Sequence, residues 1–206
     1  MFMQDATSFR PAEPACFAFG GPATRPSIGR VGMSAASLVE TPQGWRQAGT
    51  LMLGSLVQTY DGGFCPVARL QRQVLTPAAG GALMHVPGGV LDCCSDMWLM
   101  PDQRVMIADR VVEDVLDQSA VLVLARDLAG FRGITLRPLC QSVAVVSLGF
   151  AAEEAVVANS GALIHCAAAQ GTEPEHFETL DRVRAQAMLG LIEGGAHFSD
   201  QICRAA

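Results

Sequence analysis

Residues 37–63 read SLVETPQGWRQAGTLMLGSLVQTYDGG, and this stretch decides the fold class. Its first apolar run ends at Pro42-Gln43-Gly44, and its second ends at Asp61-Gly62-Gly63. Proline and glycine interrupt strands and form turns, and an Asp-Gly pair between two apolar runs is a strong hairpin signal. The stretch therefore predicts short β-strands joined by tight turns, with a hairpin at Asp61-Gly62-Gly63.

The same pattern continues on both sides, from Met33 to about Gln170. Short runs rich in Val, Ile, Leu and Thr alternate with Gly and Pro turns, which is typical of an all-β sandwich or barrel-like fold. Within 96–107, the segment Met97–Met100 is apolar at every position. Successive side chains of a strand point to opposite faces, so this segment predicts a central strand that is covered on both faces.

The two ends of the chain differ from this middle part. Residues 1–31 are rich in Pro, Gly and Ala without periodicity, which predicts an irregular, disordered tail. We divide the remainder into a β domain over 32–170 and a C-terminal helix and tail over 171–206. The helix is expected to begin at Thr172 and to stop at Gly194-Gly195. Its apolar face is built from residues at helical spacing, namely Phe177, Leu180, Val183, Met188, Leu191 and Ile192.

Composition excludes several classes of function. The 206 residues carry a net charge of −6, and all fourteen basic residues are Arg. This balance argues against nucleic-acid binding, and the lack of Lys excludes Schiff-base and P-loop chemistry. The start MFMQDATSFR is not a secretory signal, and no stretch predicts a transmembrane segment. We expect a cytoplasmic protein, or one that is exported without a cleaved signal peptide.

The seven cysteines include no C-x-x-C spacing, so neither a disulfide framework nor a zinc site is indicated. Cys93-Cys94 is interpreted as a turn with one buried and one exposed thiol. The sequence predicts no metal and no cofactor, and it leaves a protein partner and the oligomeric state open.

Three blocks, in order, carry a family resemblance. Residues 37–63 match the pattern T-x-I-x-T-P-D-G followed by G-D-x-V-x-T-x-D-G. Residues 96–107, DMWLMPDQRVMI, match D-L-x-L-S-P-x-H-R-V-L-V, and residues 146–166, VSLGFAAEEAVVANSGALIHC, match closing strands that end in A-N-G-x-x-V-H-N. Together they resemble bacterial Hint (Hedgehog/intein) domains over about residues 32–166. The resemblance implies the compact all-β Hint fold of many short strands.

The resemblance also implies a self-processing activity, in which a Cys or Ser at the first position attacks the preceding peptide bond. Counting back from Ser37 places that position at Gly32, which has no nucleophile. The assisting Ser/Thr and His correspond to Met100 and Gln103, whose thioether and neutral amide perform no acid–base chemistry near pH 7. The resemblance thus implies a Hint fold without its N-terminal chemistry.

The closing block departs in part from the family pattern. Ser147 and Glu153 stand where relatives often have His, while His165 matches the penultimate His and Cys166 replaces the terminal Asn. His165 and Cys166 are adjacent on a predicted strand, so their side chains point to opposite faces. If the family assignment holds, residues 32–37 and 165–166 lie side by side, with the strand of Gln103 beside them.

Two classes of function stay open at this stage, together with an unrelated β-barrel binding protein. The first is a Hint-like binding or structural module that has lost self-cleavage. The second is a self-cleaving domain with a displaced nucleophile, Ser34 or Cys16, that acts with His165. The short tail ahead of the domain favours the first, because a self-processing domain normally follows a cargo that it releases.

Overall fold

A computed structural model describes residues 31–170 and 176–205 of the chain. The predicted tail over 1–31, apart from its last residue, lies outside the described residues, and so do Cys16 and Thr172. Within the described part, fourteen strands form two antiparallel sheets, and the all-β prediction is confirmed. In the same part of the chain, no helix is both long and apolar enough to cross a membrane.

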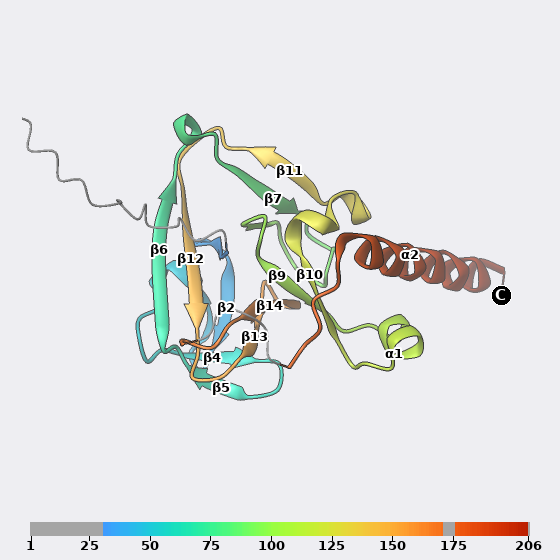
Figure 1. Cartoon of the computed structure of the whole chain (residues 1–206), viewed down its shortest axis with the longest axis horizontal. Helices are drawn as coiled ribbons and strands as arrows, with labels where there is room; N and C mark the ends of the chain where they lie inside the picture. The colour runs from blue at the N-terminus through green and yellow to red at the C-terminus, as the bar shows by residue number, and fades with distance from the viewer. Residues whose placement is uncertain (1–30, 171–175, 206) are drawn as a thin grey trace, which may run out of the picture.

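Both sheets combine strands from distant parts of the sequence (Figure 1). The first sheet runs in the order β11 (Thr135–Pro138), β7 (Ala82–Val86), β8 (Met97–Leu99), β1 (Met33–Ser34), β12 (Val143–Gly149) and β6 (Arg69–Leu75). The second runs in the order β10 (Val121–Leu124), β9 (Arg104–Ile107), β14 (Ala162–Cys166), β13 (Glu154–Ala158), β2 (Leu38–Thr41) and β3 (Gly44–Gln47). The hairpin β4 (Leu56–Thr59) and β5 (Gly63–Pro66) joins this sheet, because β4 pairs with β13. The described 3-10 helices are η1 (Ala48–Thr50), η2 (Pro77–Ala79), η3 (Ala125–Leu128) and η4 (Phe131–Gly133).

The hairpin predicted at Asp61-Gly62-Gly63 is confirmed. Thr59 and Gly63 are the last paired residues of β4 and β5. The Thr59 hydroxyl accepts from the Gly62 N–H at 3.2 Å, so the turn is closed by a side chain as well as by the ladder. Gly63 has a φ of +69°, a conformation that favours glycine.

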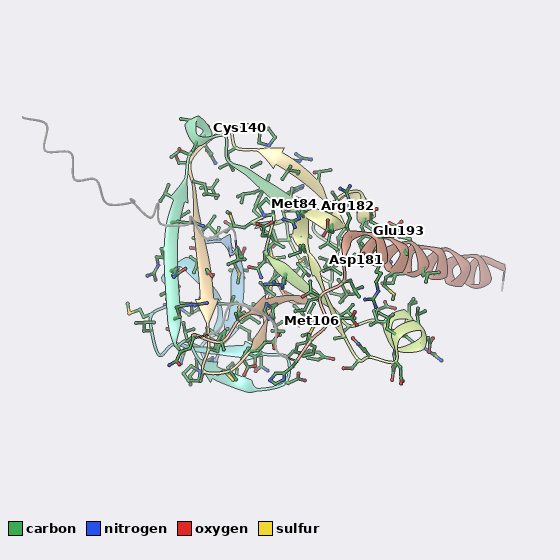
Figure 2. The ribbon with its side chains drawn as sticks, viewed as in Figure 1. Met84, Met106, Cys140, Asp181, Arg182 and Glu193 are labelled. Atoms are coloured by element: carbon green, nitrogen blue, oxygen red, sulfur yellow. The ribbon has the colours of Figure 1, made fainter. Side chains whose placement is uncertain are left out.

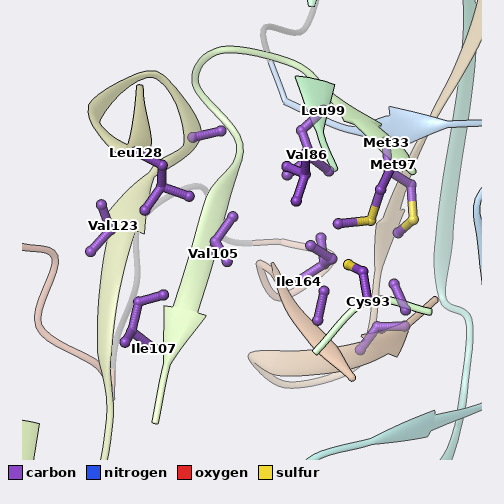
Figure 3. Close-up of a cluster of buried hydrophobic side chains, with 14 of the residues drawn as sticks. Met33, Val86, Cys93, Met97, Leu99, Val105, Ile107, Val123, Leu128 and Ile164 are labelled. Atoms are coloured by element: carbon purple, nitrogen blue, oxygen red, sulfur yellow. The ribbon is translucent and has the colours of Figure 1, made fainter. Parts of the chain in front are cut away.

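β8 is the central strand that the apolar run at 97–100 predicts. It pairs with β7 on one side and with β1 on the other. Met97 and Leu99 are buried in the main core with Met33 (Figure 3). On the opposite face Trp98 and Met100 pack in a smaller cluster with Leu83 and Val145. Burial on both faces fixes β8, and the start of β1 beside it, in the interior.

The helices differ from the sequence prediction. A short helix α1 (Arg110–Leu116) follows β9, where we expected only strands; the Asp109 carboxylate caps it by accepting from the Val111 N–H at 2.8 Å. α2 (Arg182–Ala205) begins ten residues after the predicted start at Thr172. The Asp181 carboxylate accepts from the N–H groups of Val183 and Arg184. Just before it, the Leu180 N–H donates to the carbonyl of Leu122 on β10, an edge strand of the second sheet. Residues that the sequence assigned to the first turns of the helix therefore form backbone hydrogen bonds with β10 instead.

The predicted end of α2 is also wrong, because the helix continues past Gly194-Gly195 to Ala205. Glycine inside a helix costs only about 1 kcal/mol, which is not enough to end it. The buried face also differs from the predicted one: Ala185, Met188, Leu189 and Ile192 are buried, whereas Val183 and Leu191 are exposed. Figure 2 shows Asp181 and Arg182 at the beginning of α2 and Glu193 further along it; the Glu193 carboxylate accepts from the Arg132 N–H at 3.1 Å.

Candidate functional site

A cavity of about 420 Å³ lies where the start of β1 meets the end of β14. Its wall also includes the turn between β8 and β9, the middle of β12, the start of β6 and η3. The lining residues are Val31, Gly32, Met33, Arg69, Asp102, Gln103, Arg104, Leu124, Arg126, Val146, Ser147, Leu148, Ile164, His165, Cys166 and Ala167. The size is that of a small-molecule site.

Gly32 sits in this wall in a conformation that excludes a side chain. Its φ is +138°, which L residues rarely adopt. A Cβ built on Gly32 would lie 2.7 Å from the backbone oxygen of Val146 and 2.9 Å from Cγ1 of Val145. Both peptide groups of Gly32 are nevertheless held, because its N–H donates to Gln103 Oε1 at 2.8 Å and its carbonyl accepts from the Met100 N–H at 2.9 Å.

The side-chain amide of Gln103 joins the two ends of the domain. Besides accepting from Gly32, it donates through Nε2 to the carbonyl of His165 at 2.7 Å and to that of Arg104 at 2.8 Å. An amide offers both an acceptor and two donors, whereas a neutral imidazole offers one of each. Gln103 is 5% exposed, so these bonds form in the interior, where an unmade bond is costly.

His165 is bound to a buried carboxylate. Its Nε2 lies 2.7 Å from Oε1 of Glu153, and the side chains are only 3% and 1% exposed. The other carboxylate oxygen of Glu153 accepts from the His176 N–H at 2.8 Å. Glu153 therefore connects the cavity wall to the segment that leads into α2.

Cys166 follows His165 and is buried as well. Desolvation, together with the nearby Glu154 carboxylate, raises the pKa of the Cys166 thiol to about 12, although Arg69 acts in the opposite direction. Its Sγ donates to the carbonyl of Ile164 at 3.5 Å. The thiolate is the nucleophilic form of cysteine, and burial disfavours that form here.

A sequence model of the Hint domain family matches residues 31–164, about two thirds of the chain. The chain belongs to the Hint domain family. The resemblance stated from the sequence is confirmed, including the fold that it implies.

Solved structures similar to this Hint domain are inteins and intein-like domains. A splice-inactive variant of the AceL NrdHF class 3 split intein is 13% identical, with a TM-score of 0.46, over 68% of this chain and 99% of that one. A bacterial intein-like domain from Clostridium thermocellum is 15% identical, with a TM-score of 0.46, over 65% and 97%. The MchDnaB-1 intein is 15% identical, with a TM-score of 0.41, over 65% and 98%. A search of the curated proteins found no match.

The Hint domain brings together most of the predicted positions. Gly32, Gln103, His165 and Cys166 line one cavity, so their predicted convergence is confirmed, whereas their roles stay predictions. Ser147 lines the same cavity. His165 and Cys166 are both buried, because β14 is covered on both faces.

Other predicted positions lie elsewhere. The Met100 side chain packs with Leu83 and Val145, and only its N–H reaches Gly32. Ser34 is not among the residues that line the cavity; its hydroxyl accepts from the Ala36 N–H at 3.2 Å. Cys93 is buried and Cys94 exposed, as predicted for that turn.

No sequence pattern predicted the charged residues of the cavity wall. Arg69, Arg104 and Arg126 come from β6, β9 and η3, and Asp102 pairs with Arg126. No local pattern marks these arginines, because they are far apart in the chain and only the fold brings them to one cavity. Among the described residues, no group of three His, Cys, Asp or Glu could hold a metal ion.

Proposed function

We propose that this Hint domain has lost self-cleavage and acts as a binding module through the cavity at its former reaction centre. The observation that carries the proposal is Gly32. Self-processing needs a nucleophile at the first position of the domain, and here the backbone conformation and the contact with Val146 leave no room for a Cβ.

Gln103 supports the proposal from the side of proton transfer. Its Oε1 accepts from the N–H of Gly32, the peptide group beside the first position. A carboxamide does not protonate a departing amine near neutral pH, so the general-acid contribution, on the order of 10²–10⁴-fold, is lost. What this side chain contributes is two hydrogen bonds, to Gly32 and to His165, that hold the ends of the domain together.

The C-terminal end supports the same conclusion. Cleavage there uses an Asn that cyclises, and its place is taken by Cys166. Burial raises the pKa of the Cys166 thiol to about 12, so the nucleophilic thiolate is disfavoured near pH 7. The neighbouring His165 is held by Glu153 at 2.7 Å. Neither end therefore has a group suited to attack a peptide bond.

Intact-mass spectrometry of the full chain tests the proposal. The purified protein is expected to keep its mass of 21.7 kDa through long incubation at pH 7–8, with and without dithiothreitol. A second sample at pH 9 favours thiolate formation and makes the test more stringent.

A fragment that begins near Gly32 or Ser34 contradicts the proposal and supports an active domain with a displaced nucleophile. Ser34→Ala and Cys16→Ala then identify the attacking group, since only one of them should stop the cut. His165→Ala shows whether the imidazole takes part.

A further inference from the structure

The cavity carries more positive charge than the rest of the molecule leads one to expect. The chain has a net charge of −6, yet three arginines and one aspartate are among the residues that line this cavity. The three arginines come from separate elements and converge only in the folded domain. Charged groups at a partly buried wall cost desolvation energy, which favours an anionic ligand in front of them.

Arg69 and Arg126 keep hydrogen-bonding capacity for a ligand beyond their contacts within the chain. Arg69 donates through Nη1 to the carbonyl of Ala169 at 3.1 Å, and Arg126 pairs with Asp102. A guanidinium has five N–H donors in a planar fork, so one contact does not exhaust it. The Arg126 side chain is 50% exposed and therefore within reach of a molecule that enters from solvent.

The rest of the wall is largely apolar. Val31 and Leu124 line the same cavity, and both keep exposed surface, Val31 being 36% exposed and Leu124 half-buried. A ligand that fits both parts has a single negative charge and an apolar stem. A polyanion fits less well, because the acidic surface of the chain repels it at long range.

We propose that the cavity binds a carboxylate with an apolar stem, its charge held by Arg69 and Arg126. The stem packs against Val31 and Leu124. This proposal rests on the proposed function, since it assigns a ligand to the cavity of a domain that no longer cleaves itself. A small free acid and the C-terminal residue of a peptide share this chemistry.

Titration calorimetry on the full chain tests the proposal with a matched pair of probes. N-acetyl-leucine carries the carboxylate, and N-acetyl-leucinamide has the same stem without the charge. We expect the acid to bind at least tenfold more tightly than the amide, and to bind more weakly as NaCl is raised. Equal affinities, or no binding of the acid at millimolar concentration, overturn the proposal.

Further probes identify the source and the anion. An acetylated peptide ending in leucine, with a free or an amidated C-terminus, separates the two sources: tighter binding of the free-ended peptide than of N-acetyl-leucine assigns a peptide terminus, and weaker binding assigns a small acid. Inorganic phosphate is the competing anion. If phosphate binds as tightly as N-acetyl-leucine, the assignment to carboxylates is wrong.

Variants locate the binding. Arg126→Gln and Arg69→Gln should each weaken binding of N-acetyl-leucine at least fivefold, while Arg46→Gln on β3, outside the cavity, should not change it. Thermal melting confirms that each variant is folded, and two arginine positions keep the test decisive if one variant fails to fold. Unchanged affinity in a folded Arg69 or Arg126 variant overturns the site. A domain that stays intact but binds no carboxylate contradicts only this inference, whereas cleavage contradicts the proposed function itself.

Discussion

The start of β1 and the end of β14 meet at one cavity but differ in what they bring to it. Gly32 contributes only backbone, held by Gln103 and by the Met100 N–H. His165 keeps its imidazole, and that ring is paired with the buried carboxylate of Glu153. One end has no side chain to react, and the other has a side chain that is already engaged.

The hydrogen bonds that hold the two ends of the domain together do not need reactive side chains. Gln103 bonds to the N–H of Gly32 and to the carbonyl of His165, so a neutral amide connects the ends. Backbone hydrogen bonds are made whatever the side chain at a position is. The two ends of this Hint domain therefore meet without a side chain at position 32.

The largest effect is expected at Gly32. Gly32→Ala should lower the free energy of unfolding by about 4 kcal/mol, because a strained φ and overpacking against Val146 each cost on the order of 1–3 kcal/mol. Gly44→Ala is the matched control: its φ is +94°, but no atom lies within 4 Å of the added Cβ. Urea unfolding measures both variants.

Gly32→Cys, which returns a thiol to the first position, should be as unstable as Gly32→Ala and should remain uncleaved. The same holds when it is combined with Met100→Thr and Gln103→His. If Gly32→Ala proves no less stable than Gly44→Ala, the conformation of Gly32 is not what excludes a side chain.

Gln103→Ala should cost about 3 kcal/mol, because it leaves the N–H of Gly32 and the carbonyl of His165 without their partner in the interior. Gln103→His should cost about 1 kcal/mol, since a neutral imidazole replaces the acceptor but only one of two donors. Gln58→Ala, whose amide donates to the adjacent Thr59 carbonyl, is the control and should be nearly neutral. Equal losses for Gln103→Ala and Gln58→Ala argue against the role given to Gln103.

Glu153→Ala should lower stability by about 2 kcal/mol, because it removes the partner of His165 and of the His176 N–H. Hydrogen exchange at the His176 amide should accelerate as well. Glu154→Ala, the neighbouring residue on β13, contacts the Cys65 thiol at 3.4 Å and should leave the His176 amide protected. Unchanged protection in Glu153→Ala contradicts the connection between the cavity and the segment before α2.

The last effect concerns Cys166; it is absent at neutral pH and develops only in alkaline solution. Its folded pKa of about 12 lies above the ordinary value of 9.0, so the unfolded chain loses this proton first. Stability is complete below pH 9 and falls as pH rises from 9 towards 12, by about 1.4 kcal/mol per pH unit at most. Cys166→Ala should flatten this slope in urea unfolding, whereas Cys140→Ala, at an exposed thiol, should not. An identical slope in Cys166→Ala contradicts the raised pKa.

Sequence patterns predicted several local features of the Hint domain. The turn at Asp61-Gly62-Gly63 and the central strand at 97–99 follow from residue types and alternation within a few positions. The family pattern placed Gly32, Gln103 and His165 at one site. The same local reasoning failed for α2, whose start depends on the pairing of Leu180 with Leu122 on β10.

By itself, the sequence determined the all-β fold, its turns and the membership in the Hint family, because these depend on short-range patterns and motif order. Only the tertiary structure decided the φ of Gly32, the burial of Glu153 beside His165, and the meeting of Arg69, Arg104 and Arg126. Each of these depends on contacts between strands that are distant in the chain. A local pattern carries no information about which such groups come to share one cavity.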